Sequence, residues 1–235
     1  PDPSSLVFDS KREQREGYTL IQGLLSHKLT ARESHGFVGH PNLEDSKEQL
    51  PMFLLLPDSK TRRTCFLVFP EGKSGLFNAD GSPTESVNRL LDAGFAVCSV
   101  DLLLQGEFLK DDQTITQTRR VANKREAAAY TFGYNASLFA RRVHDILSVI
   151  AFLKAQPLHS GPIDLVGLRG AGPWVGAAQA QAGDSIARTV VHTDGFRFAA
   201  IRDIHDPNFL PGGAKYHDLP GMLALGAPRE LTYPV

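Results

Sequence analysis

Short runs of apolar residues, free of polar alternation, recur along the chain and predict buried strands. They cover residues 52–56, 65–69, 95–100, 163–166, 189–192 and 230–235. Continuous apolar runs of this length are typical of strands that are covered on both faces, as in a parallel sheet. We therefore expect a mostly parallel sheet at the centre of the molecule.

Helical periodicity fills the segments between these runs. Apolar residues recur every three or four positions over 138–153, and Pro157 follows the end of this predicted helix. A second helix is predicted over 86–93, before Gly94, and a third begins near Pro173, which suits a first helical turn. The alternation predicts a doubly wound α/β fold, a sheet flanked by helices, whose ligands bind at the carboxyl ends of the strands.

The first fifty residues differ from the rest of the chain. They are polar and irregular, and only the part near 20–29 predicts a strand. We expect residues 1–50 to form an extended N-terminal arm and residues 51–235 to form one α/β domain without internal repeats.

Composition narrows the classes of function. The 235 residues carry a formal net charge of -1, which predicts neither nucleic acid nor an anionic membrane as a partner. The longest apolar runs are too short to span a bilayer. Cys65 and Cys98 lie in strand-like runs and are expected to be reduced core residues. No Cys/His cluster has the spacing of metal ligands, so we expect neither a metal nor another cofactor.

Residues 163–174 carry the most informative pattern in the chain. They read Ile-Asp-Leu-Val-Gly-Leu-Arg-Gly-Ala-Gly-Pro-Trp, which predicts a buried strand, a sharp turn of small residues and the start of a helix. This is the layout of a nucleophile elbow, whose usual motif is Gly-x-Ser-x-Gly. Arg169 stands at the serine position, and Ala171 stands where the last glycine would be.

The elbow and three further motifs, in the same order, resemble acetyl xylan esterase-type α/β-hydrolases. The further motifs lie at 130–135, at 142–147 and at 206–220. The chain is most similar to a bacterial group of such domains in which the elbow serine is often replaced. The resemblance implies an α/β-hydrolase fold whose C-terminal strand and helix are missing. It also favours an exported protein, periplasmic or extracellular, that acts on plant or algal polysaccharide.

For the family's reaction, ester hydrolysis, the resemblance implies a serine nucleophile, an oxyanion hole, and an acid and a histidine from later loops. Gly170 in the elbow and Gly72 in the loop after 65–69 match oxyanion-hole positions, and Glu71 precedes Gly72. The serine does not carry over, and the acid and histidine would lie beyond Tyr233. The chain therefore resembles a hydrolase scaffold without its nucleophile.

Two roles other than catalysis are open for Arg169, and a catalytic role other than that of nucleophile is the third alternative. A guanidinium stays charged at physiological pH and cannot act as a nucleophile, but at a helix N-terminus it suits a carboxylate or another anion. Arg169 either bridges to a nearby carboxylate or, together with Glu71 and Trp174, binds an anionic or sugar ligand. For Trp174 the alternative is packing in the core.

Four other residues are candidates for catalysis. Ser74 follows Gly72 on a strand-end loop and is an alternative nucleophile, whereas His192, Asp194 and His205 follow the strand after the elbow. Each of these has a structural alternative. Two functions stay open: a carbohydrate-esterase-like domain, or a non-catalytic module that binds an acetylated or acidic sugar or packs on a second domain or partner chain.

Overall fold

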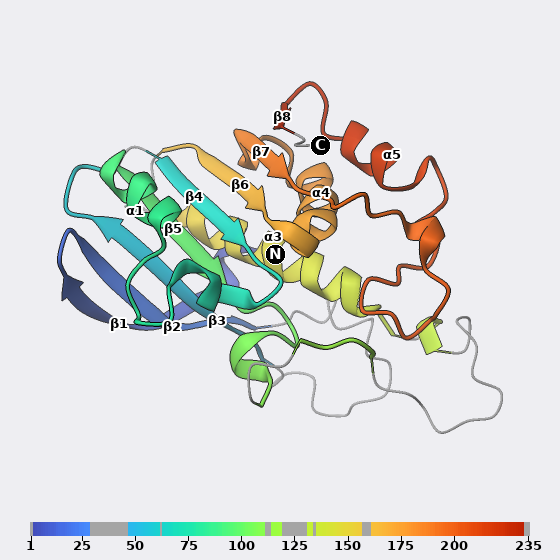
Figure 1. The fold of residues 1–235 in the computed structure, drawn as a ribbon, viewed down its shortest axis with the longest axis horizontal. Helices are drawn as coiled ribbons and strands as arrows, with labels where there is room; N and C mark the ends of the chain where they lie inside the picture. Colours follow the sequence, from blue (N-terminus) through green and yellow to red (C-terminus); the bar gives the residue numbers. More distant parts are fainter. Residues whose placement is uncertain are drawn as a thin grey trace.

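A mixed sheet runs through the molecule in the computed structural model, which describes residues 2–28, 47–61, 63–110, 114–118, 131–133, 135–156 and 161–232. Within these residues, eight strands form the sheet in the order β1-β2-β3-β5-β4-β6-β7-β8 (Figure 1). Its strands are β1 Leu6–Arg15, β2 Tyr18–Lys28, β3 Lys47–Pro57, β4 Arg63–Val68, β5 Phe95–Val100, β6 Ile163–Gly167, β7 Arg188–Val191 and β8 Glu230–Thr232.

The predicted α/β architecture is confirmed. Strands β4, β6, β7 and β8 are parallel to their neighbours, and β5 is parallel to β4 but antiparallel to β3; β1, β2 and β3 are joined in antiparallel pairs. The helices are α1 Glu85–Asp92, α3 Leu138–Ala155, α4 Gly172–Ala182 and α5 Asp218–Ala224. The first three were predicted, α3 from its apolar periodicity and α1 and α4 from Gly94 and Pro173 at their ends; α5 was not, because its seven residues are too few to show a helical period.

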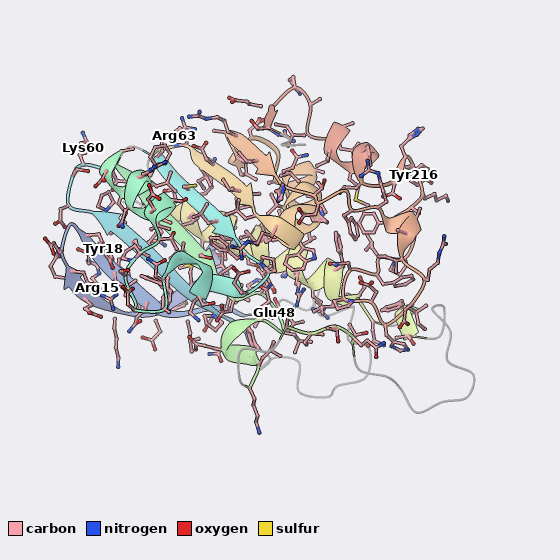
Figure 2. All side chains as sticks on the ribbon, viewed as in Figure 1. Arg15, Tyr18, Glu48, Lys60, Arg63 and Tyr216 are labelled. Atoms are coloured by element: carbon pink, nitrogen blue, oxygen red, sulfur yellow. The ribbon has the colours of Figure 1, made fainter. Side chains whose placement is uncertain are left out.

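The N-terminal segment supplies two strands rather than the one expected. β1 and β2 form a hairpin that pairs from Leu6 with His27 to Arg15 with Tyr18, and β2 continues the sheet to β3. Figure 2 shows Arg15 and Tyr18 at the turn end of this hairpin. The expectation of an extended arm with a single strand is therefore corrected. Sequence missed β1 because it is an edge strand whose polar side chains are exposed on both faces, which leaves no apolar alternation.

Two apolar cores lie on opposite faces of the sheet. Helix α1 covers one face, α3 and α4 cover the other, and α5 packs against α4 (Figure 1). Cys65 belongs to the first core and Cys98 to the second; both are free thiols, as expected. Burial raises the pKa of Cys65 to about 12, so this thiol is unreactive. None of the helices in the described residues has the length and apolar character needed to cross a membrane.

Candidate active site

The strand–turn–helix predicted for the elbow is present. β6 ends at Gly167, a short 3₁₀ turn covers Arg169–Ala171, and α4 begins at Gly172. The Leu168 amide donates to the Val68 carbonyl oxygen at 3.1 Å, which ties the turn to the end of β4. Arg169 has φ 52°, in the left-handed region. For a residue other than glycine this conformation costs about 1–2 kcal/mol, and an elbow holds its nucleophile in a strained turn of this kind.

Glycines allow the close contacts behind the turn. A Cβ on Gly167 would lie 2.8 Å from Val175 Cβ, and a Cβ on Gly172 would overlap the carbonyl oxygen of His192. Gly170 differs, because the nearest atom to a Cβ there is Pro70 Cγ at 3.8 Å. Packing of α4 against β6 and β7 therefore requires glycine at positions 167 and 172 but not at position 170.

The Arg169 side chain forms an ion pair across the strand ends. Its Nη1 donates to Glu71 Oε1 at 2.7 Å, so of the two open roles the carboxylate bridge is present in this structure. The Arg169 side chain is 70% exposed and that of Glu71 is 37% exposed. Exposed ion pairs contribute little to stability, so a ligand carboxylate can compete with Glu71 for the guanidinium.

Three of the candidate residues line one cavity of about 640 Å³, a volume typical of small-molecule sites. They are Glu71, Ser74 and Arg169. The Ser74 hydroxyl donates to the Glu71 carbonyl oxygen at 3.2 Å and is exposed. The rest of the described lining comes from β1, β2, β3 and the loop before α1 and contains no histidine: Arg15, Leu20, Gln22, Phe53, Gly75, Phe77, Asn78, Ala79, Gly81 and Thr84.

A buried ion pair lies at this edge of the sheet, between the loops that follow β4 and β5. The Lys73 ammonium pairs with the carboxylates of Asp101 and Glu107. Asp101 also accepts from the backbone amides of Lys73, at 2.8 Å, and Glu107, at 3.0 Å. The carboxylate thus joins the loop after β4 to the loop after β5. The sequence offered one signal for this pair, a charged residue close after each of two buried runs, but their spacing does not predict that the two loops meet.

The two predicted oxyanion donors, Gly72 and Gly170, both lie at this edge of the sheet, but the Gly72 amide already donates a hydrogen bond within the protein. The Gly72 amide donates to the Phe69 carbonyl oxygen at 3.2 Å. Its φ of 80° favours glycine, and a Cβ there would overlap the Asp101 carboxylate. Gly72 therefore shapes the turn in this structure. The oxyanion roles of Gly72 and Gly170 stay predictions.

The remaining candidates lie outside the lining of this cavity. His192 Nε2 is 3.3 Å from Asp194 Oδ1, and both side chains are exposed after β7. His205 is buried, and its backbone amide donates to Asp203 Oδ1 at 2.9 Å. The structure therefore does not bring these residues to Ser74.

Trp174 is a correction to the expected ligand-binding set. It is 4% exposed, its Nε1 donates to Asn208 Oδ1 at 2.8 Å, and the Arg142 guanidinium lies 4.4 Å from its ring centroid. The ring is therefore covered and packs in the core, since its polar tip is satisfied inside the protein. Burial lowers the pKa of Arg142 to about 10, and this side chain donates to the carbonyl oxygens of Leu103 and Leu104.

No family model matches the chain, and no curated protein matches it. Solved structures do match. A protein of Bacteroides fragilis NCTC 9343, provisionally assigned as an acetyl xylan esterase, aligns with a TM-score of 0.63 and 17% identity, over 99% of this chain and 63% of that one. The chain has the fold of an α/β-hydrolase.

Two CE15 esterases give the same result. One is a promiscuous esterase from a marine bacterial metagenome, with a TM-score of 0.60 and 14% identity over 97% of this chain and 66% of that one. The other is a glucuronoyl esterase from Teredinibacter turnerae T7901, with a TM-score of 0.54 and 16% identity over 99% of this chain and 62% of that one. The chain thus spans less than two thirds of each of these three proteins.

Proposed function

We propose that this chain is a carbohydrate-esterase-like α/β-hydrolase domain in which Arg169 occupies the nucleophile position and binds the carboxylate of an acidic sugar. One observation carries the proposal: a non-glycine residue is held at φ 52° in the elbow, and its exposed guanidinium lines the cavity. Replacement of the elbow serine, as in the bacterial group that the sequence resembles, is part of this proposal.

Backbone strain supports a ligand-binding role for Arg169. A glycine would adopt the same φ without steric cost, yet the chain has arginine there. Strained residues cluster at functional sites, where the surrounding structure holds them in place. The strain at Arg169 positions a permanent cation over the cavity. A guanidinium presents two parallel N–H donors that match the two oxygens of a carboxylate.

The geometry gives less support to hydrolysis. A nucleophile needs a general base at hydrogen-bond distance, about 2.6–3.2 Å. Ser74 donates to a backbone carbonyl, and no histidine is among the described residues that line its cavity. An oxyanion hole without nucleophile and base retains about 10³-fold catalysis over water, by the serine protease precedent. We therefore favour the binding module over the esterase.

The likeness to carbohydrate esterases suggests the ligand class. One of the three proteins described above is a glucuronoyl esterase, an enzyme that acts on glucuronoyl esters and so releases a free carboxylate. An acidic sugar also provides the carboxylate that Arg169 would bind. As an alternative to a sugar, the same edge of the sheet would bind a second domain or a partner chain.

The test combines binding with hydrolysis. Titration with glucuronate, followed by NMR, should give saturable binding to the wild-type chain and none to Arg169→Ala. Arg89→Ala is the matched control, because Arg89 is equally exposed on α1 and pairs with Glu85. The wild-type chain should accelerate hydrolysis of p-nitrophenyl acetate by no more than about 10³-fold over water. Hydrolysis that Arg169→Ala abolishes, or glucuronate binding that this variant keeps, would overturn the proposal.

A further inference from the structure

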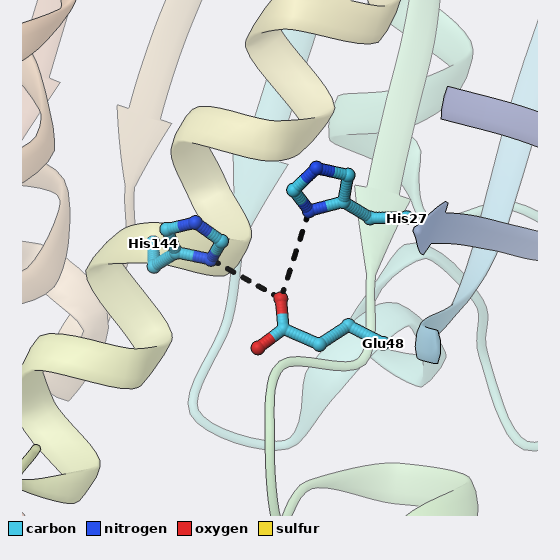
Figure 3. Close-up of side chains that lie close together, drawn as sticks. All are labelled: His27, Glu48 and His144. Atoms are coloured by element: carbon cyan, nitrogen blue, oxygen red, sulfur yellow. Dashed lines mark ion pairs between the residues drawn. The ribbon is translucent and has the colours of Figure 1, made fainter. Parts of the chain in front are cut away.

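Two imidazoles and one carboxylate converge on a common point outside the elbow cavity (Figure 3). His27 lies at the end of β2, Glu48 at the beginning of β3, and His144 in α3. Glu48 Oε2 is 3.3 Å from His144 Nδ1 and 3.9 Å from His27 Nδ1. All three ligand atoms lie within 4.8 Å of one another.

The fold explains why residues so far apart in sequence meet. His27 and Glu48 are register partners in the antiparallel β2–β3 pair, so their side chains leave neighbouring positions on the same face. Helix α3 packs on that face and places the His144 ring 6.0 Å from the His27 ring, centroid to centroid. Figure 3 shows both Nδ1 atoms directed at the same carboxylate oxygen.

These separations are close to those of ligands around one metal ion. Two ligand atoms bound to a tetrahedral Zn²⁺ at about 2.0–2.1 Å are about 3.3 Å apart. Glu48 and His144 already have this separation. His27 Nδ1 would have to approach Glu48 Oε2 by about half an ångström, and the two histidine ligand atoms, which lie within 4.8 Å of each other, would have to approach by up to about 1.5 Å.

The surroundings also resemble those of a bound metal. Arg141 Nη1 donates to the second carboxylate oxygen of Glu48, Oε1, at 3.1 Å, which leaves Oε2 directed at the imidazoles. Metal-binding carboxylates commonly have an outer hydrogen bond of this kind, which orients them. His27 is 3% exposed, whereas His144 is 31% exposed, so the cluster is buried on one side and open to solvent on the other.

We propose that His27, Glu48 and His144 bind a divalent transition metal of the Zn²⁺ class and thereby clamp the β2–β3 pair to α3. Two imidazoles and a carboxylate suit Zn²⁺, with water in the fourth position on the open side. The positive charge of Arg141 opposes the metal and limits its affinity. Spacing in the sequence gave no sign of this site, because 20 residues separate His27 from Glu48 and 95 separate Glu48 from His144.

The test uses the untagged chain and the metal alone. Co²⁺ absorption and competition for Zn²⁺ with a coloured chelator should show one bound equivalent in the wild type. His144→Gln should bind at least about tenfold more weakly, the effect of altering even an outer partner of a metal ligand. His217→Gln, on the exposed loop before α5, is the matched control and should bind like the wild type.

Thermal unfolding gives a second readout that is independent of any activity. Zn²⁺ should raise the Tm of the wild type more than that of His144→Gln at the same Zn²⁺ concentration, because a ligand of the native state stabilises it by mass action. The partly exposed His144 is preferred over His27, whose replacement can disturb the core. Absence of a stoichiometric metal in the wild type, or equal affinity in His144→Gln, would overturn the proposal.

Discussion

Two ion pairs join loops at the same edge of the sheet, and they differ in burial. In the Lys73–Asp101 pair the side chains are 7% and 1% exposed, whereas in the Arg169–Glu71 pair they are 70% and 37% exposed. The first lies between the loops that follow β4 and β5. The second lies between the loops that follow β4 and β6, on the lining of the cavity.

The difference in burial distinguishes an ion pair that stabilises the loops from an ion pair that can bind a ligand. Buried charges cannot exchange partners without leaving an uncompensated charge in the protein interior. Asp101 is further held by two backbone amides, so the buried pair sets the shape of both loops. The exposed pair has no such bonds to the backbone and presents a cation that a ligand can reach. On this account the buried pair holds the two loops in position, and the exposed pair provides the cation that binds the ligand.

Asp101→Ala should have the largest effect on stability. It leaves the buried Lys73 ammonium with Glu107 as its remaining carboxylate partner and removes the acceptor of two backbone amides, so the free energy of unfolding should fall by about 2–5 kcal/mol. Urea denaturation of the variant beside the wild type measures this loss. A loss below about 1 kcal/mol, the range of exposed pairs, would remove the distinction between the two pairs.

Gly172→Ala should have the next largest effect. A Cβ there overlaps the His192 carbonyl oxygen, so overpacking should cost about 1–3 kcal/mol. Gly170→Ala is the control from the same turn, where the nearest atom is 3.8 Å away, and it should change stability by less than about 0.5 kcal/mol. Equal losses in the two variants would show that the elbow backbone differs from the one described.

Arg169→Gly and Arg169→Ala together should reveal the strain at the elbow. Both variants lose the ion pair to Glu71, but only glycine adopts φ 52° freely. The glycine variant should therefore be more stable than the alanine variant by about 1 kcal/mol. Chemical denaturation of the two proteins gives the difference directly, and an alanine variant as stable as the glycine variant would argue against a strained turn.

Glu71→Gln should have the smallest effect, on binding rather than stability. It removes the charge that competes with a ligand carboxylate, so glucuronate affinity should rise about twofold to fivefold. NMR titration measures the change. This prediction depends on the proposed function, and a fall in affinity would show that Glu71 contacts the ligand favourably.

Much of the fold was predictable because its signals are local. Apolar runs marked β3 to β8, a helical period marked α3, and Gly94 and Pro173 marked the ends of α1 and α4, so each of these signals is continuous in the sequence. The elbow was found for the same reason: strand, turn and helix start are consecutive. The edge strand β1 places only Leu6 and Phe8 against the core and is polar from Asp9 onward, so only its pairing with β2 reveals it.

The candidate site was less predictable because its partners are distant in sequence. Glu71 and Arg169 were both candidates, but their ion pair spans 98 residues and depends on β4 and β6 being neighbours. The Lys73–Asp101 pair depends in the same way on β4 lying beside β5. Trp174 was assigned to a ligand because its chemistry allows it, and only packing under Arg142 shows that its ring is covered.

The central claim is that Arg169 acts as a ligand-binding cation at the elbow. The most direct measurement is the ¹⁵N NMR resonance of the Arg169 Nε–H group, assigned by its loss in Arg169→Lys, during titration with glucuronate and then with glucose. The account predicts a saturable shift with glucuronate and none with the neutral sugar. A resonance that glucuronate leaves unmoved, or that glucose moves equally, would contradict it.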